Sequence, residues 1–95
     1  MFDMKACGSR IKALREAQEG LTQERLAELL NTSDSHIRKI ENGQRTASID
    51  IYIEIAQYFH VSLDYLLLGK EYPAAEIKAD IEDAVSILRK ITSRI

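Results

Sequence analysis

Apolar and polar residues alternate along this chain with the period of an α-helix, and short polar breaks divide the pattern into segments. The first segment runs from Lys5 to Gln18, and Gly20 is placed to end it in a left-handed conformation. The second runs from Gln23 to Leu30, after Thr22, whose hydroxyl can cap it. The apolar positions of these two segments are Ala6, Ile11, Leu14, Ala17, Leu26, Ala27 and Leu30.

Three further helices are predicted before position 70. Ser33 is a good N-cap for a helix that ends at Asn42 and Gly43, with Ile37 and Ile40 facing inward. The next helix follows Ser48, is supported by Asp50 in its first turn and reaches His60, and a short one capped by Ser62 ends at Gly69. The apolar stripe of the helix after Ser48 is predicted to be Ile49, Tyr52, Ile53, Ala56 and Phe59, and that of the short helix Leu63, Leu66 and Leu67, whereas Ile51 is expected to lie off the core face and to contact the C-terminal segment.

A longer helix is predicted after Tyr72 and Pro73, because no further helix breaker follows. Its apolar residues are spaced 4, 3, 4, 3 and 4 apart, which is a heptad seam. The seam consists of Ile77, Ile81, Ala84, Leu88, Ile91 and Ile95. We therefore predict an all-α protein with five short helices in residues 1–69 and one longer helix in residues 70–95.

Composition narrows the class of protein. Apolar residues make up 45% and charged residues 29% of the 95 positions, which is ordinary for a globular protein. No apolar run is long enough to cross a membrane and the first residues lack the apolar core of a secretory signal, so we expect a cytoplasmic protein. Cys7 is the only cysteine, so it can form neither an intramolecular disulfide nor a thiolate metal cluster.

The net charge of −2 is unevenly distributed. Residues 1–47 carry 8 Lys and Arg against 7 Asp and Glu, whereas residues 48–95 carry 5 against 8. Binding to nucleic acid requires positive charge where the phosphates lie, and does not require a basic total. The distribution therefore permits a DNA-binding surface in the first half, with low affinity from a single chain.

The most informative unit is residues 22–43, which form a helix, a tight turn of three residues and a second helix. Such a unit presents its second helix to the major groove of DNA. With Ile37 and Ile40 turned inward, the outward residues are Asp34, Ser35, Arg38 and Lys39. Arg can donate to the O6 and N7 atoms of guanine, and Asp can accept from N4 of cytosine, so these four residues are candidates for reading bases.

Residues 8–69 resemble the Cro and lambda-repressor (XRE-type) family of bacterial and phage helix-turn-helix regulators. The residues that carry the resemblance are Gly8-Ser9-Arg10-Ile11, Leu14-Arg15, Leu21-Thr22-Gln23-Glu24-Arg25-Leu26-Ala27, Ile37, Ile40-Glu41-Asn42-Gly43 and Val61-Ser62-Leu63-Asp64-Tyr65-Leu66-Leu67. They cover about two thirds of the chain in order. The resemblance implies a five-helix lambda-repressor-like DNA-binding domain and a transcriptional regulator, with repressor as the expected type.

The resemblance also implies individual roles. Thr22, Gln23, Asn42 and Arg45 match positions that contact phosphates, and Gln23 also supports the reading helix. Arg15 and Glu41 match a largely buried ion pair between the first and third helices. Two departures from the family pattern are Asn31, where the turn often has glycine, and Thr46-Ala47, where the loop often has Asn-Pro.

Other classes of function find little support in the sequence. No constellation of residues indicates an enzyme, no glycine-rich phosphate loop is present, and His36 and His60 lack partners at metal-binding spacing, so we expect no cofactor. His36 is expected at the edge of the groove. The alternative function is that of a protein-interaction module, such as the antitoxin of a toxin–antitoxin pair.

The C-terminal segment leaves three alternatives open. It can fold back on its own domain, pair with the same segment of a second chain, or bind another protein. Val85 and Ile87 widen its apolar stripe, which favours burial against more than one neighbour. We favour a homodimer on a palindromic operator, because a weak single reading domain gains affinity when it is doubled.

Overall fold

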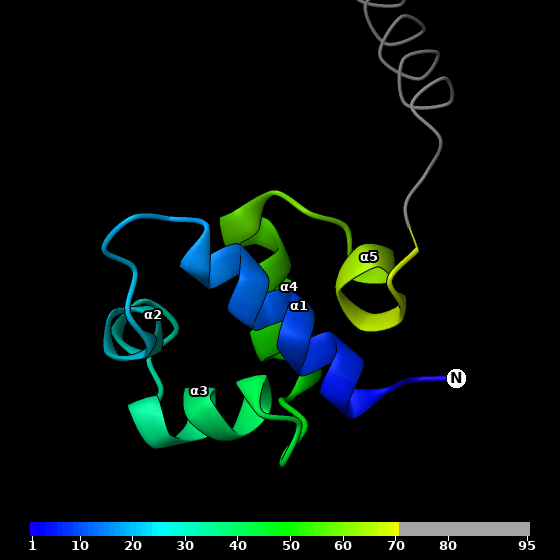
Figure 1. The fold of residues 1–95 in the computed structure, drawn as a ribbon, viewed down its shortest axis with the longest axis horizontal. Helices are drawn as coiled ribbons and strands as arrows, with labels where there is room; N and C mark the ends of the chain where they lie inside the picture. Colours follow the sequence, from blue (N-terminus) through cyan, green and yellow to red (C-terminus); the bar gives the residue numbers. More distant parts are fainter. Residues whose placement is uncertain (71–95) are drawn as a thin grey trace, which may run out of the picture.

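The structure, a computed structural model, describes residues 1–70. This part of the chain contains five α-helices and no strand, which confirms the all-helical prediction (Figure 1). The helices are α1 (Met4–Glu16), α2 (Gln23–Leu29), α3 (Asp34–Glu41), α4 (Ile49–Phe59) and α5 (Leu63–Leu68). The predicted C-terminal helix and its seam, Ile77, Ile81, Ala84, Leu88, Ile91 and Ile95, lie outside the described residues.

Every one of the five helices begins after a side chain that caps its free backbone N–H groups. Thr22, Ser33 and Ser62 do so as the sequence predicts, and Ser48, which the sequence does not predict as a cap, does so too; each accepts from the backbone three residues later. The cap of α1 is Asp3, whose Oδ1 accepts from the backbone N–H groups of Lys5 and Ala6 at 3.0 and 3.1 Å. The helix α1 begins one residue before the predicted start at Lys5 and ends two residues before the predicted end at Gln18.

Two of the turns between helices depend on residues with positive φ that are not glycine. Asn31, between α2 and α3, has φ 55°, and His60, after α4, has φ 56°. Asparagine tolerates this left-handed conformation better than most residues, because its short polar side chain can bond locally. Asn31 thus occupies the position at which the sequence departs from the glycine of the family pattern.

The core draws side chains from all five helices. It consists of Cys7, Ile11, Leu21, Leu26, Ala27, Leu30, Ile37, Ile40, Tyr52, Ile55, Ala56 and Leu66. Part of the predicted stripe of α4 is wrong, because Ile49 is 58% exposed, whereas Ile55 is fully buried. The expectation that Ile51 lies off the core face is also wrong, since this residue packs against the core, whereas its expected contact with the C-terminal segment lies outside the described residues. Apolar residues surround most of α4, so helical spacing alone does not select the buried face.

The first helix also differs from its predicted stripe. Cys7 is 1% exposed and belongs to the core, whereas Ala17 is exposed just beyond the end of α1. The neighbouring Gly8 is buried, and a Cβ there would collide with the carbonyl oxygens of Ile40 and Glu41. The missing side chain lets α1 and α3 pack backbone against backbone.

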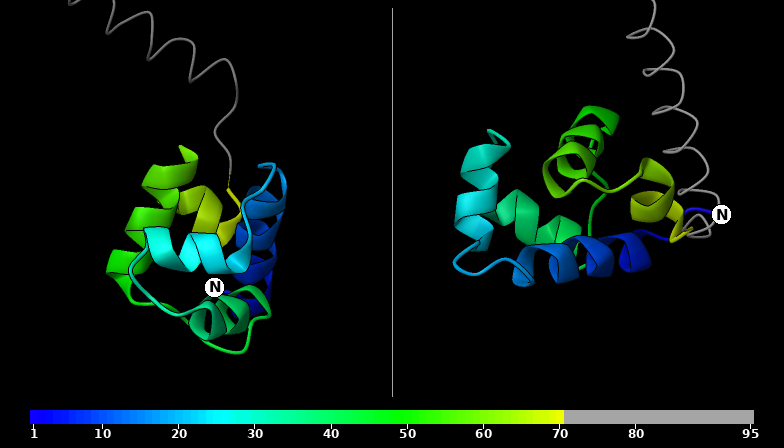
Figure 2. Two further views of the ribbon diagram at one scale, coloured as in Figure 1. Left: turned by 90° about the vertical axis from the view of Figure 1, so that its left-hand side faces the viewer. Right: turned by 90° about the horizontal axis from the view of Figure 1, so that it is seen from above.

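Figures 1 and 2 show how the helices are arranged around α1. The helices α2 and α5 lie at opposite ends of the domain, and α3 packs against both α1 and α2. The N-terminus lies beside α5 in Figure 1 and in the right-hand view of Figure 2. Among the described helices, none is long and apolar enough to cross a membrane.

Candidate nucleic-acid interface

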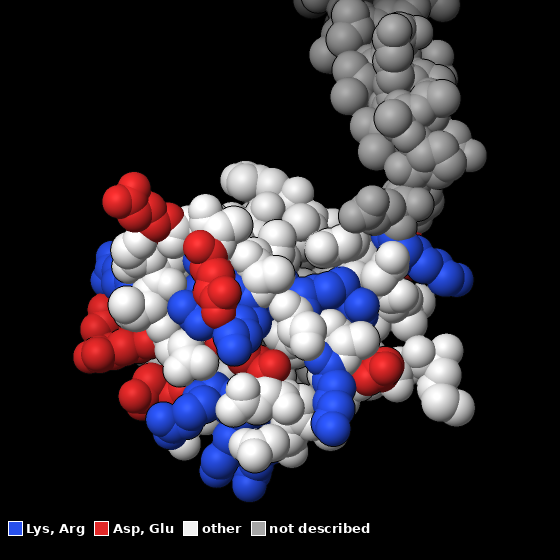
Figure 3. All heavy atoms as spheres, viewed as in Figure 1, with Lys and Arg blue, Asp and Glu red and all other residues white. Residues whose placement is uncertain are grey.

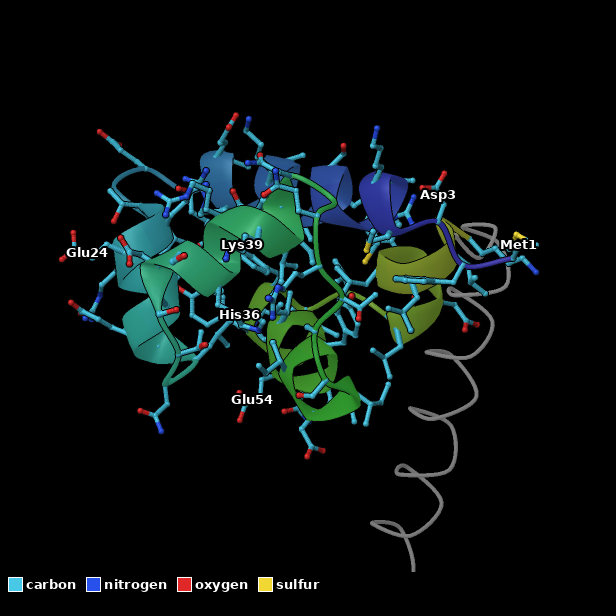
Figure 4. All side chains as sticks on the ribbon, turned by 90° about the horizontal axis from the view of Figure 1, so that it is seen from below. Met1, Asp3, Glu24, His36, Lys39 and Glu54 are labelled. Carbon is cyan, nitrogen blue, oxygen red and sulfur yellow. The ribbon has the colours of Figure 1, made fainter. Side chains whose placement is uncertain are left out.

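One edge of α3 is buried and the opposite edge is open. Ile37 and Ile40 are 1% and 2% exposed and anchor the helix in the core. Asp34 and Arg38 are exposed, and Ser35 and Lys39 are half-buried. The four residues predicted to read bases therefore lie away from the buried edge. Viewed from below, α3 lies in front of the other helices, with Lys39 on its open side and His36 at the side that faces α4 (Figure 4).

The turn between α2 and α3 fixes the direction in which this edge points. The backbone N–H of Thr32 donates to the carbonyl of Ala27 at 2.9 Å, across the left-handed Asn31. Ser33 Oγ then accepts from the backbone N–H of His36 at 3.1 Å and starts α3. The second helix of the pair is held at its first turn, where a reading helix approaches bases most closely.

A shallow polar hollow lies beside the open edge of α3. Its volume is about 200 Å³, and its lining is Ser33, Ser35, His36, Lys39 and Arg45. The lining contains two cationic side chains and no carboxylate. His36 is half-buried there, although the sequence placed it only at the groove edge and not among the reading residues. The hollow is thus suited to a hydrogen-bond acceptor, such as an acceptor atom on a base edge or a phosphate oxygen.

The loop after α3 brings Arg45 to this hollow. The backbone N–H groups of Gln44 and Arg45 both donate to the carbonyl of Lys39, at 2.8 and 3.3 Å. Gly43, with φ 73°, reverses the chain so that these bonds form. The sequence alone could not place Arg45 next to Lys39, because that proximity depends on how the loop folds back.

Asp34 differs from the other outward residues, because its carboxylate already has a partner. Its Oδ1 accepts from the backbone N–H of Ser35 at 2.9 Å, within the first turn of α3. A carboxylate at the N-terminal end of a helix also interacts favourably with the helix dipole. To accept from a base, Asp34 would have to give up or share this bond.

Behind the open edge, a buried network ties α3 to α1 and α2. Arg15 Nε donates to Glu41 Oε2 at 2.7 Å, and Arg15 Nη2 donates to Glu41 Oε1 at 3.1 Å. The side chain of Glu41 is 0% exposed. The hydrogen bond with Glu41 raises the pKa of Arg15 above its ordinary value. This bidentate pair holds the C-terminal end of α3 against α1.

Gln23 belongs to the same network. Its Nε2 donates to Glu41 Oε1 at 2.9 Å, so the first residue of α2 is bonded to the last residue of α3. Its neighbour Thr22 is exposed and caps α2, and Asn42, which follows Glu41, is exposed too. The junction between the start of α2 and the end of α3 therefore contains Thr22, Gln23 and Asn42, whereas Arg45 lines the hollow.

The charge of this face is mixed. Figure 3 shows Lys and Arg side chains along the lower edge of the molecule, over α3, with Asp and Glu side chains beside them on the side of α2. The cations nearest the reading edge are Arg38, Lys39 and Arg45. Within residues 1–70, no group of three His, Cys, Asp or Glu side chains could hold a metal ion.

Comparison with known sequences identifies the family to which the chain belongs. The family described as Helix-turn-helix matches residues 11–66, which include α2 and α3. The HTH-type transcriptional regulator PrpR of Mycobacterium tuberculosis is 32% identical over 76 residues, covering 80% of this chain and 15% of PrpR. The HTH-type transcriptional regulator ImmR of Bacillus subtilis is 31% identical over 74 residues, covering 78% of this chain and 57% of ImmR. The chain thus spans only part of both relatives.

A solved structure resembles the described fold. The restriction-modification controller protein C.AhdI of Aeromonas hydrophila is 32% identical in sequence, with a TM-score of 0.60. The similarity covers 68% of this chain and 93% of C.AhdI. Nearly the whole of that protein is therefore matched by part of this one.

Proposed function

Because this chain belongs to the helix-turn-helix family of transcriptional regulators, we propose that it binds duplex DNA sequence-specifically and reads the major groove with α3. The observation that carries the proposal is the open edge of α3, backed by the buried Glu41 network. The major groove is wide enough to admit one α-helix. We assign the chain no catalytic activity and no cofactor.

Base reading falls to Asp34, Ser35, Arg38 and Lys39. Arg38 and Lys39 are cations one turn into α3, suited to the acceptor atoms O6 and N7 of guanine. Asp34 is suited to N4 of cytosine once its carboxylate turns from the backbone of Ser35. These contacts set the sequence preference, because only base edges distinguish one site from another.

Phosphate contacts fall to Thr22, Gln23, Asn42 and Arg45. The first three lie at the junction of α2 and α3, where Gln23 already bonds to Glu41. One amide hydrogen of Gln23 is committed to Glu41, which leaves the other available to a phosphate oxygen. Contacts of this kind fix the position of the domain on the duplex and make binding depend on salt.

We also propose a division of the chain into two parts that together form a dimer. We propose residues 1–69 as the DNA-binding domain and residues 70–95 as the dimerisation element, whose seam pairs with that of a second chain. Two domains would then place their α3 helices in successive major grooves of a palindromic operator, about 34 Å apart. A site occupied in this way blocks transcription if it overlaps a promoter, so we propose a repressor.

The proposal is tested by selecting bound sites from random duplex DNA with the full chain. We expect a palindromic sequence with half-sites one helical turn apart, bound in a way that weakens steeply as the salt concentration rises. Recovery of random sequence, with equal affinity for every duplex, would contradict sequence-specific binding. Selection of a single half-site would contradict the proposed dimer, but not sequence-specific binding.

A further inference from the structure

An apolar groove lies at the end of the domain where α5 meets the N-terminus. Its volume is about 340 Å³, and its lining is Phe2, Ala47, Ile49, Tyr52, Leu67 and Leu68. No lining residue is charged. The volume falls at the lower end of the range of about 300–1,000 Å³ that is usual for pockets of small ligands.

Large apolar side chains are exposed in this groove. Phe2 is 39%, Ile49 58% and Leu68 44% exposed. Single exposed apolar residues are ordinary, but several around one concave surface are typical of a binding site. Among the described residues, Leu29 is comparably exposed at 43%, but it lies on α2, at the opposite end of the domain (Figure 1).

The walls of the groove are held by specific contacts. The ring of Phe2 packs edge-on against Tyr52, with centroids 6.2 Å apart, and the Tyr52 hydroxyl accepts from the backbone N–H of Ala47 at 3.0 Å. Arg10 Nε donates to the carbonyl of Leu66 at 3.0 Å and fixes the last turn of α5. The groove is therefore a built surface on the folded domain.

We propose that this groove binds Ile77 and Ile81, the first apolar residues of the chain's own C-terminal segment, and that the seam from Ala84 onward is what remains for pairing with a second chain. The chain continues from Leu68 through Gly69 and Lys70, so the segment begins beside the wall that α5 provides. The seven residue-to-residue steps from Lys70 to Ile77 can span up to roughly 23 Å when the chain is extended, which reaches any part of a groove this small.

An occupant from the same chain also has the advantage of concentration. A covalently tethered segment is present at an effective concentration in the millimolar range, which favours it over a second molecule at micromolar concentration. The seam residues are uncharged, and so is the lining of the groove. Val85 and Ile87 broaden the segment beyond its seam, so docking of its first turns leaves apolar residues for a second contact.

Crosslinking between paired cysteines tests this proposal in the full chain. The test variant combines Asp50→Cys, beside the groove residue Ile49, with Lys78→Cys, which leaves every groove and seam residue in place. The matched control adds Leu68→Asn to the same two cysteines, because Leu68 is 44% exposed in the groove and the tether between the cysteines is unchanged. Cys7 is 1% exposed, and burial raises the pKa of its thiol, so it does not compete for a short bis-maleimide crosslinker.

We expect a crosslink within one chain that forms at least about threefold faster in the test variant than in the Leu68→Asn control, because docking holds the two cysteines closer together than the tether alone does. Its rate should not depend on protein concentration. Equal rates in the two variants would overturn the proposal, because the groove would then have no preference for the segment. A crosslink mainly between two chains would also overturn it and assign the groove to a second copy. None of these outcomes depends on DNA binding.

Discussion

At the scale of single residues, Glu41 has the largest structural role. Its carboxylate is completely buried, and it accepts from Arg15 and Gln23, so one side chain joins α1, α2 and α3. No buried side-chain nitrogen or oxygen among the described residues lacks a hydrogen-bond partner. The network therefore supports the open edge of α3 without leaving a buried polar atom unpaired.

We expect Arg15→Met to lower the free energy of unfolding by about 3–5 kcal/mol, because it leaves the buried carboxylate of Glu41 without its cation. Chemical denaturation measures the loss. The matched control is Arg25→Met, since Arg25 pairs with Glu28 at 2.9 Å but both side chains are 59% exposed. The control should lose about 0.5 kcal/mol or less. Equal losses in the free energy of unfolding would show that the buried pair stabilises the fold no more than the exposed pair does.

The buried thiol of Cys7 and hydroxyl of Tyr52 predict sensitivity to alkali. Burial raises the pKa of Cys7 above its ordinary 9.0 and that of Tyr52 above its ordinary 10.0. Between the unfolded and folded pKa values, the folded state holds more protons, so stability falls as the pH rises through this window. We expect Tm to fall from pH 8 to pH 11, and to fall less steeply in Cys7→Ala. Identical slopes in the two proteins would contradict the assignment to Cys7.

At the scale of elements, most helix limits could be predicted because capping is a local property. Thr22, Ser33 and Ser62 cap their helices as the sequence predicts. The buried face of α4 could not be predicted, since apolar residues surround that helix and only its neighbours decide which of them are covered. The hollow beside α3 could not be predicted either, because it depends on how the loop returns Arg45 to Lys39.

Gly8 tests the packing of α1 against α3. We expect Gly8→Ala to lower the free energy of unfolding by about 1–3 kcal/mol, because the added methyl group collides with the backbone of Ile40 and Glu41. This loss should appear even though alanine has a higher intrinsic helix propensity than glycine. The exposed neighbour provides the control, Ser9→Ala, which should change stability little. A Gly8→Ala protein at least as stable as its parent would show that the two helices can separate at no cost.

At the scale of the whole molecule, two surfaces of one domain have different chemistry. The face of α3 is polar and carries Arg38, Lys39 and Arg45, whereas the end at α5 and the N-terminus carries the uncharged groove. The rigid network at Glu41 lies between the helices and not on either surface. DNA binding and segment docking therefore use different surfaces, which are linked by the loop that contributes Arg45 to the hollow and Ala47 to the groove.

The central claim, that the open edge of α3 reads DNA, is tested most directly by comparing two variants of equal charge on the selected site. Arg38→Ala/Lys39→Ala removes two cations from the reading edge, and Lys12→Ala/Lys70→Ala removes two exposed cations elsewhere. We predict that the first variant loses at least about tenfold more affinity than the second, and loses its preference over unrelated duplexes, while both retain the helical signal of the parent. Equal losses in the two variants, with the sequence preference intact, would contradict the claim.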